Sequence, residues 1–107
     1  MRINITEKLQ QERPVLEIRG KAFEIDNRKD TVFSYTEKDF KDKKSDEIIQ
    51  ETIRHFAGEK ALKEVLNMKE LSFHDYQMIF YAVIALAMEI TLEEAEERFQ
   101  NSRKTEA

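Results

Sequence analysis

Cysteine is absent from this 107-residue chain, which also has only two glycines and one proline. Without cysteine the chain can form no disulfide, no thiolate metal site and no cysteine nucleophile. The two glycines, Gly20 and Gly58, lie too far apart to build a glycine-rich phosphate-binding loop. These absences argue against nucleotide-dependent and cysteine-dependent enzymes, and so little glycine and proline is typical of a helix-rich domain.

Long hydrophobic runs are also missing. The longest stretch with almost no polar side chain, Tyr76 to Met88, contains thirteen residues, whereas a membrane-spanning helix needs roughly 18 to 20. Charges interrupt the apolar residues between Met1 and Leu9, so no secretory signal is expected there. The sequence therefore predicts a cytoplasmic protein that has no membrane partner.

Charged residues make up 37% of the chain, and they are distributed unevenly. Residues 1–45 contain 11 basic and 9 acidic side chains, whereas residues 46–107 contain 7 basic and 13 acidic ones. The second half is therefore acidic, and the basic residues of the first half alternate with acids. Because nucleic-acid binding needs a concentrated positive surface, we do not expect DNA or RNA as a partner.

No group of residues has the spacing of a catalytic or metal-binding motif. His55 and His74 have no second histidine or paired carboxylate at a ligand spacing. Ser72, His74 and Asp75 have the residue types of a catalytic triad, but their place at the start of a predicted helix favours helix capping. The sequence thus predicts a protein that is not an enzyme and uses no cofactor or metal.

The first 35 residues form the predicted β-rich part. Strand-like residues flank Gly20, so we expect a hairpin whose turn uses a positive φ and whose core face carries Ile18, Phe23 and Ile25. Residues 31–35 are β-branched and aromatic enough to predict a third strand, and residues 3–5 are a candidate fourth. This part is therefore expected to be an antiparallel meander of about three strands.

A charged connector at residues 36–45, in which Phe40 is the single apolar side chain, leads into a helical part at residues 46–100. Apolar spacing in that part predicts four helices, at about 46–56, 59–67, 73–88 and 92–100. The expected capping residues are Ser45, the Ser72–Asp75 pair and the Thr91–Glu94 pair. Residues 101–107 are expected to fray. The predicted fold is a single α+β domain over residues 1–107, with about four helices clustered around one apolar central helix.

The predicted helix at 73–88 is apolar on every face, so neighbouring elements or another molecule must cover most of it. Its aromatic and methionine side chains are more often core residues, yet flexible methionines also suit grooves that accept varied apolar partners. We expect one edge of the helix, around Met78 and Met88, to dock a client or a second copy. The candidate protein-binding residues are Met68, Phe73, Tyr76, Met78, Phe80, Tyr81 and Met88.

Residues 58–100, GEKALKEVLNMKELSFHDYQMIFYAVIALAMEITLEEAEERFQ, resemble the tail assembly chaperones of long-tailed bacteriophages and prophages of Gram-positive bacteria. The likeness lies in the Leu71-Ser72-Phe73-x-Asp75-Tyr76 helix start, the apolar helix and the Glu-rich closing helix. It implies a non-enzymatic virion morphogenesis protein of the bacterial host cytoplasm, which coats the hydrophobic, helical tape measure protein during tail assembly. It also implies that a longer frameshift product, where one is made, recruits the tail tube protein.

Two other interpretations stay open. The predicted helices on either side of residues 68–72 resemble a helix-turn-helix, which would suit a small DNA-binding phage regulator, although His74, Asp75 and Gln77 supply no basic residue for base contacts. An enzyme would need residues distant in sequence to meet in a pocket. An exposed hairpin edge would also allow a homo-oligomer.

Overall fold

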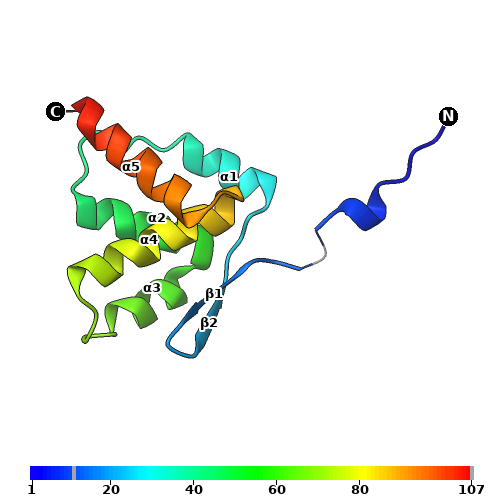
Figure 1. Cartoon of the computed structure of the whole chain (residues 1–107). Coiled ribbons are helices and arrows are strands. Elements are labelled where there is room, and N and C mark those ends of the chain that lie inside the picture. The colour runs from blue at the N-terminus through cyan, green and yellow to red at the C-terminus, as the bar shows by residue number, and fades with distance from the viewer. Residues whose placement is uncertain (11, 107) are drawn as a thin grey trace.

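The computed structural model describes residues 1–10 and 12–106, and the side chains of residues 1–10 and 12–100. The described part has an α+β fold with a two-stranded hairpin and five α-helices (Figure 1). The elements are η1 (Thr6–Lys8, a 3₁₀ turn), β1 (Val15–Ile18), β2 (Lys21–Glu24), α1 (Lys29–Thr36), α2 (Ser45–Ala57), α3 (Glu59–Leu66), α4 (Phe73–Met88) and α5 (Leu92–Glu106). None of the described helices has both the length and the apolarity that a bilayer crossing requires.

The predicted hairpin is confirmed. Ile18 pairs with Lys21 across a two-residue turn in which Arg19 and Gly20 both have positive φ, of 48° and 85°. Such a turn matches the natural twist of two antiparallel strands. Ile18 and Phe23 are buried on one face of the hairpin, and Ile25 just beyond β2 is fully buried, so the hairpin covers one end of the helical core.

The predicted third strand is wrong, because residues 31–35 lie in helix α1. Packing outweighs the strand-like composition here, because β propensity depends strongly on the tertiary context. Val32 and Tyr35, three residues apart, face the core cluster together, and the Tyr35 hydroxyl lies 2.7 Å from the Thr52 hydroxyl of α2. The Asp26 carboxylate accepts hydrogen bonds from the Arg28 amide and the Thr31 hydroxyl at the start of the helix.

Four smaller predictions also need correction. Residues 3–5 form no strand, and the chain there leads into the 3₁₀ turn η1. Ser45 is the first residue of α2 and makes no capping hydrogen bond, because Lys44 occupies the cap position. Helix α3 ends at Leu66, one residue before the predicted end. Helix α5 continues to Glu106 instead of ending at Gln100, since no glycine or proline interrupts residues 101–106; Ala107 lies outside the described residues.

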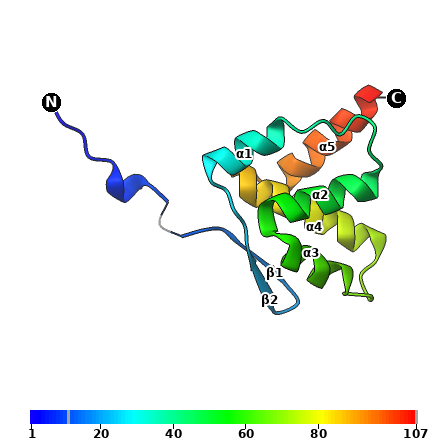
Figure 2. The same cartoon turned by 180° about the vertical axis from the view of Figure 1, so that it is seen from behind.

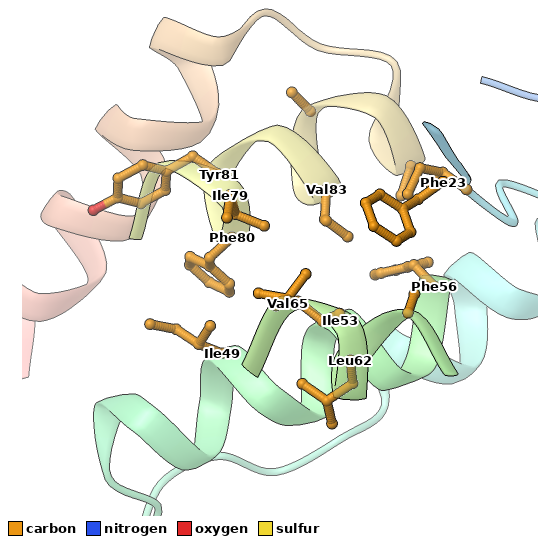
Figure 3. Close-up of a cluster of buried hydrophobic side chains, with 14 of the residues drawn as sticks. Phe23, Ile49, Ile53, Phe56, Leu62, Val65, Ile79, Phe80, Tyr81 and Val83 are labelled. Atoms are coloured by element: carbon orange, nitrogen blue, oxygen red, sulfur yellow. The ribbon is translucent and has the colours of Figure 1, made fainter. Parts of the chain in front are cut away.

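Helix α4 is the centre of the body, as predicted. The Ser72–Asp75 capping box fixes its first residue, and the Thr91–Glu94 pair does the same for α5. Helix α4 packs against α2, α5 and β1. Figure 3 shows its side chains facing those of α2, α3 and the hairpin. The labelled core residues are Phe23, Ile49, Ile53, Phe56, Leu62, Val65, Ile79, Phe80, Tyr81 and Val83.

Candidate protein-binding groove

A groove of about 470 Å³ lies where the start of α2, the end of α3 and the start of α4 meet. Its size is within the range of small binding sites. The lining side chains are mainly apolar, with polar residues contributed by the starts of α2 and α4 and by the loop between α3 and α4. They are Asp46, Gln50, Val65, Leu66, Met68, Lys69, Leu71, Ser72, Phe73 and Tyr76.

The loop between α3 and α4 shapes one wall of this groove. It closes through two short-range hydrogen bonds, from the Met68 amide to the Val65 carbonyl and from the Leu71 amide to the Met68 carbonyl. The capping box at Ser72 then sets the first turn of α4 immediately after the loop. Local hydrogen bonding therefore fixes the apolar loop residues beside Phe73.

Two large apolar side chains of the groove are exposed to water. Phe73 is 59% exposed and Leu66 is 41% exposed, and the Phe73 ring leans on Tyr76 with 6.5 Å between ring centres. Single exposed apolar residues are common on protein surfaces, but neighbouring ones in a hollow favour a binding site. This combination makes the groove the strongest candidate site among the described residues.

The Tyr76 hydroxyl is the unusual polar group of the groove. Its oxygen is buried beside Asp46 and Gln50, and the contacts with these two side chains fall short of good hydrogen-bond geometry. Burial raises the pKa of this phenol, and the nearby Asp46 carboxylate raises that pKa further. Asp46 also accepts a hydrogen bond from the Gln50 amide at 3.0 Å. The Tyr76 hydroxyl is therefore a buried polar group in the wall of a mainly apolar groove.

The candidate binding residues predicted from sequence fall into three groups. Met68, Phe73 and Tyr76 meet in the groove. Phe80 and Tyr81 are buried and contact Phe99 of α5, with ring centres 5.0 and 5.7 Å from it. Met78 and Met88 are half-buried against the core cluster and do not line the groove.

Leu66 and Leu71 line the groove but were not predicted as binding residues. The signal for Leu66 was the width of the apolar stripe on α3. Leu62, Val65 and Leu66 form a stripe on an eight-residue helix, and only the first two become buried. The apolar stripe of α3 is wider than the surface that neighbouring elements cover, so Leu66 stays exposed.

A second hollow, of about 630 Å³, lies between β2 and the junction of α2 and α3. His55 lines it, but its Nε2 atom lies 2.7 Å from the Thr31 carbonyl oxygen and therefore helps to hold α1 against α2. His74 is exposed at the start of α4. Within the described residues, no cluster of three or more histidine or acidic side chains is arranged to hold a metal ion.

No protein-family model, curated protein or solved structure matches this chain. The geometry of the groove therefore carries the functional argument.

Proposed function

We propose that this chain is a phage tail assembly chaperone, a non-enzymatic protein that holds apolar helical segments of a tape measure protein in the groove between α2, α3 and α4. The observation that carries the proposal is the pair of exposed apolar side chains, Leu66 and Phe73, beside a half-buried Tyr76. An apolar stripe of a client helix would bury these side chains and its own surface together.

The charge of the chain suits this role. The helical half is acidic, and like charge keeps many copies on one client apart from each other and in solution. A groove of this size covers only a short client segment, so binding at each site would be weak. Many copies along one long client would together shield its apolar surface.

The test is to measure, by titration calorimetry, the binding of a helical, apolar peptide from a candidate tape measure protein. We expect Leu66→Ser combined with Phe73→Ser to weaken binding about tenfold or more, because both contacts are lost. Phe33→Ser is the matched control, since Phe33 is 61% exposed on α1 and lies outside the groove. Equal loss of binding in both variants would show that the groove is not the site.

A co-expression experiment tests the biological claim separately from the site. The chain should increase the soluble yield of a full-length tape measure protein, and the double groove variant should not. If the wild-type chain leaves that yield unchanged, the chaperone proposal is wrong even where the groove binds the peptide.

A further inference from the structure

Strand β2 has an open edge, because the sheet within the described residues consists of β1 and β2 alone. In a two-residue hairpin the residues next to the turn form a hydrogen-bonded pair, and the type of pair alternates from there along the strands. Ile18 belongs to that first pair, so Ala22 and Glu24 direct their amide and carbonyl groups away from β1. The hydrogen bond from the Ile25 amide to the Pro14 carbonyl, at 2.9 Å, has the place that this alternation requires.

The outward-facing backbone groups of this edge belong to Ala22, Glu24 and, two residues further, Asp26. The Asp26 amide donates a hydrogen bond to the Phe56 carbonyl at the end of α2, at 2.8 Å. Within the described residues the backbone groups of Ala22 and Glu24 form no hydrogen bond, and both residues are exposed. The edge is therefore a row of hydrogen-bonding positions of which the protein itself uses only the last.

The second hollow, of about 630 Å³, lies beside this edge. One wall is formed by residues 22–24 of β2 and the other by Lys60, Ala61 and Glu64 of α3. Both views show the hairpin leaving the body beside α3 (Figures 1 and 2). At the junction of α2 and α3, no atom lies within 4 Å of the place that a methyl group on Gly58 would take. Helix α3 therefore stands apart from the edge and leaves its outward groups accessible.

We propose that an extended segment of a partner protein lies in this hollow and adds to β2 as a third strand. Strand addition is a common mode of peptide recognition, in which main-chain hydrogen bonds provide the affinity. In an antiparallel segment, the residue opposite Ala22 exchanges two hydrogen bonds with it, and the residue opposite Glu24 exchanges two more. A helical segment cannot do this, because its backbone groups are already bonded within the helix.

The lining of the hollow specifies the side chains of the segment. Side chains of a strand alternate between the two faces of its sheet. On the face that carries Phe23, the segment meets Phe56 and Ala61, which are apolar and buried, so an apolar side chain suits this side. On the opposite face the segment lies beside Glu24, where a basic side chain forms a favourable cross-strand pair.

Charge on the two walls favours a segment that carries both signs. Glu24 lies on the β2 wall and Lys60 on the α3 wall, and neither forms an ion pair with another described residue. A segment between the walls that places a base beside Glu24 and an acid beside Lys60 is complementary to both. The partner is therefore an extended segment in which apolar residues alternate with residues of both charges.

The β2 edge of a second copy fits this place less well than a separate segment does. Each copy has α3 on the far side of its own hollow. When two β2 strands are brought edge to edge, α3 of one copy obstructs the hairpin of the other. A single extended segment has no such wall beside it, so it can enter the hollow.

The probe is a capped peptide of about eight residues in which valine alternates with lysine, threonine and glutamate, a composition that favours strands. Amide hydrogen exchange followed by NMR measures the edge directly. With saturating peptide, exchange at Ala22 and Glu24 should slow about tenfold or more, because both amides gain a hydrogen bond. Exchange at Val15 and Glu17, which face outward on β1, should not change. An alanine-rich helical peptide of the same charge is the control and should protect neither strand.

Proline substitutions test the edge without disturbing the bonds between β1 and β2. Proline is tolerated on an edge where its missing N–H would face outward. Ala22→Pro should weaken peptide binding about tenfold or more, because one hydrogen bond is lost and the ring occupies its place. Glu17→Pro is the matched control, since Glu17 pairs with Ala22 and faces outward on β1, and it should bind like the wild type.

A charge reversal tests the same edge and leaves every backbone amide in place. Glu24 is exposed, so Glu24→Lys should keep the helical circular dichroism of the wild type. The wild type should bind the lysine-containing peptide more tightly than a peptide in which glutamate replaces that lysine. The Glu24→Lys variant should show the reverse preference.

The proposal is overturned if the peptide does not slow exchange at Ala22 and Glu24, if it protects β1 equally, or if the helical peptide gives the same protection. Equal losses of binding in Glu17→Pro and Ala22→Pro, or an unchanged peptide preference in Glu24→Lys, would also reject it. Protection that rises with protein concentration without peptide would make a second copy the occupant. The groove shares no lining residue with the hollow, so Leu66→Ser with Phe73→Ser should bind this peptide normally while losing the client.

Discussion

Replacing Phe80 and Phe73 separately by alanine distinguishes core from groove on the same helix. Phe80 is 4% exposed, and its ring centre lies 5.0 Å from that of Phe99 and 5.5 Å from that of Tyr81. Removing such a ring typically costs about 3 to 5 kcal/mol, because buried area is lost and a cavity remains. Phe73 is 59% exposed, so its removal should change stability by no more than about 0.5 kcal/mol.

The cost of removing the Phe80 ring is large compared with the total stability of a small domain, about 5 to 15 kcal/mol. Urea unfolding followed by circular dichroism measures them directly. With a denaturant slope of about 1 to 3 kcal/mol per molar, Phe80→Ala should lower the midpoint by roughly 2 M, and Phe73→Ala should leave it almost unchanged. Similar midpoints for the two variants would refute the division of α4 into a buried middle and an exposed start.

Four further substitutions test individual elements. Gly58 joins α2 to α3 with φ 96° and ψ 164°, a conformation that almost only glycine adopts, so Gly58→Ala should cost about 1 to 3 kcal/mol in urea unfolding although nothing lies near the added methyl group. The Arg28 guanidinium holds the pKa of Asp26 well below its usual range. The stability that results is present above the ordinary carboxyl pKa and is lost as the pH falls through the depressed one. The Asp26→Asn variant should therefore be less stable than the wild type by about 1 to 2 kcal/mol near neutral pH. As the pH is lowered from about 5 to about 2, the free energy of unfolding of the variant should fall less than that of the wild type. Ser72→Ala and Thr91→Ala should each cost about 1 kcal/mol, and the costs should add in the double variant because the two caps serve different helices.

The parts of the fold that could be predicted from sequence are those specified by neighbouring residues. The capping box at Ser72 and the turn at Gly20 depend on side chains and backbone angles within a few residues. The start of α4 follows from such signals, and its burial follows from a run of apolar residues that no single stripe could explain. Local chemistry is sufficient in these places because no distant contact opposes it.

Helix α1 shows where local signals are insufficient. Its residues favour a strand by composition, yet Tyr35 packs its ring 4.7 Å from that of Phe56 and lies beside His55 of α2. In strand alternation Tyr35 would share a face with Phe33, which is 61% exposed in the structure. Packing against α2, which lies outside this segment, therefore selects the helical period over strand alternation.

The groove could be predicted only in part for the same reason. Leu66 looks like a core residue in sequence, but the packing of the helices leaves it 41% exposed in the groove. Met78 and Met88 were expected at a docking edge because methionine is adaptable, but the core cluster takes up part of their surface. Residue type indicated that some apolar surface would be exposed, and tertiary packing decided which.

Buried side-chain polar groups elsewhere in the described part of the helical body have hydrogen-bond partners. The Tyr35 hydroxyl meets Thr52, and His55 meets a carbonyl of α1. The groove differs, because the buried Tyr76 hydroxyl meets Asp46 and Gln50 without a hydrogen bond of good geometry and the apolar Phe73 beside it faces water. The exposure of Phe73 is unfavourable in the free protein, and an apolar occupant would relieve it. The exposed apolar side chains of this hollow are therefore the feature that the proposed client site has to explain, and the Leu66 and Phe73 variants test it.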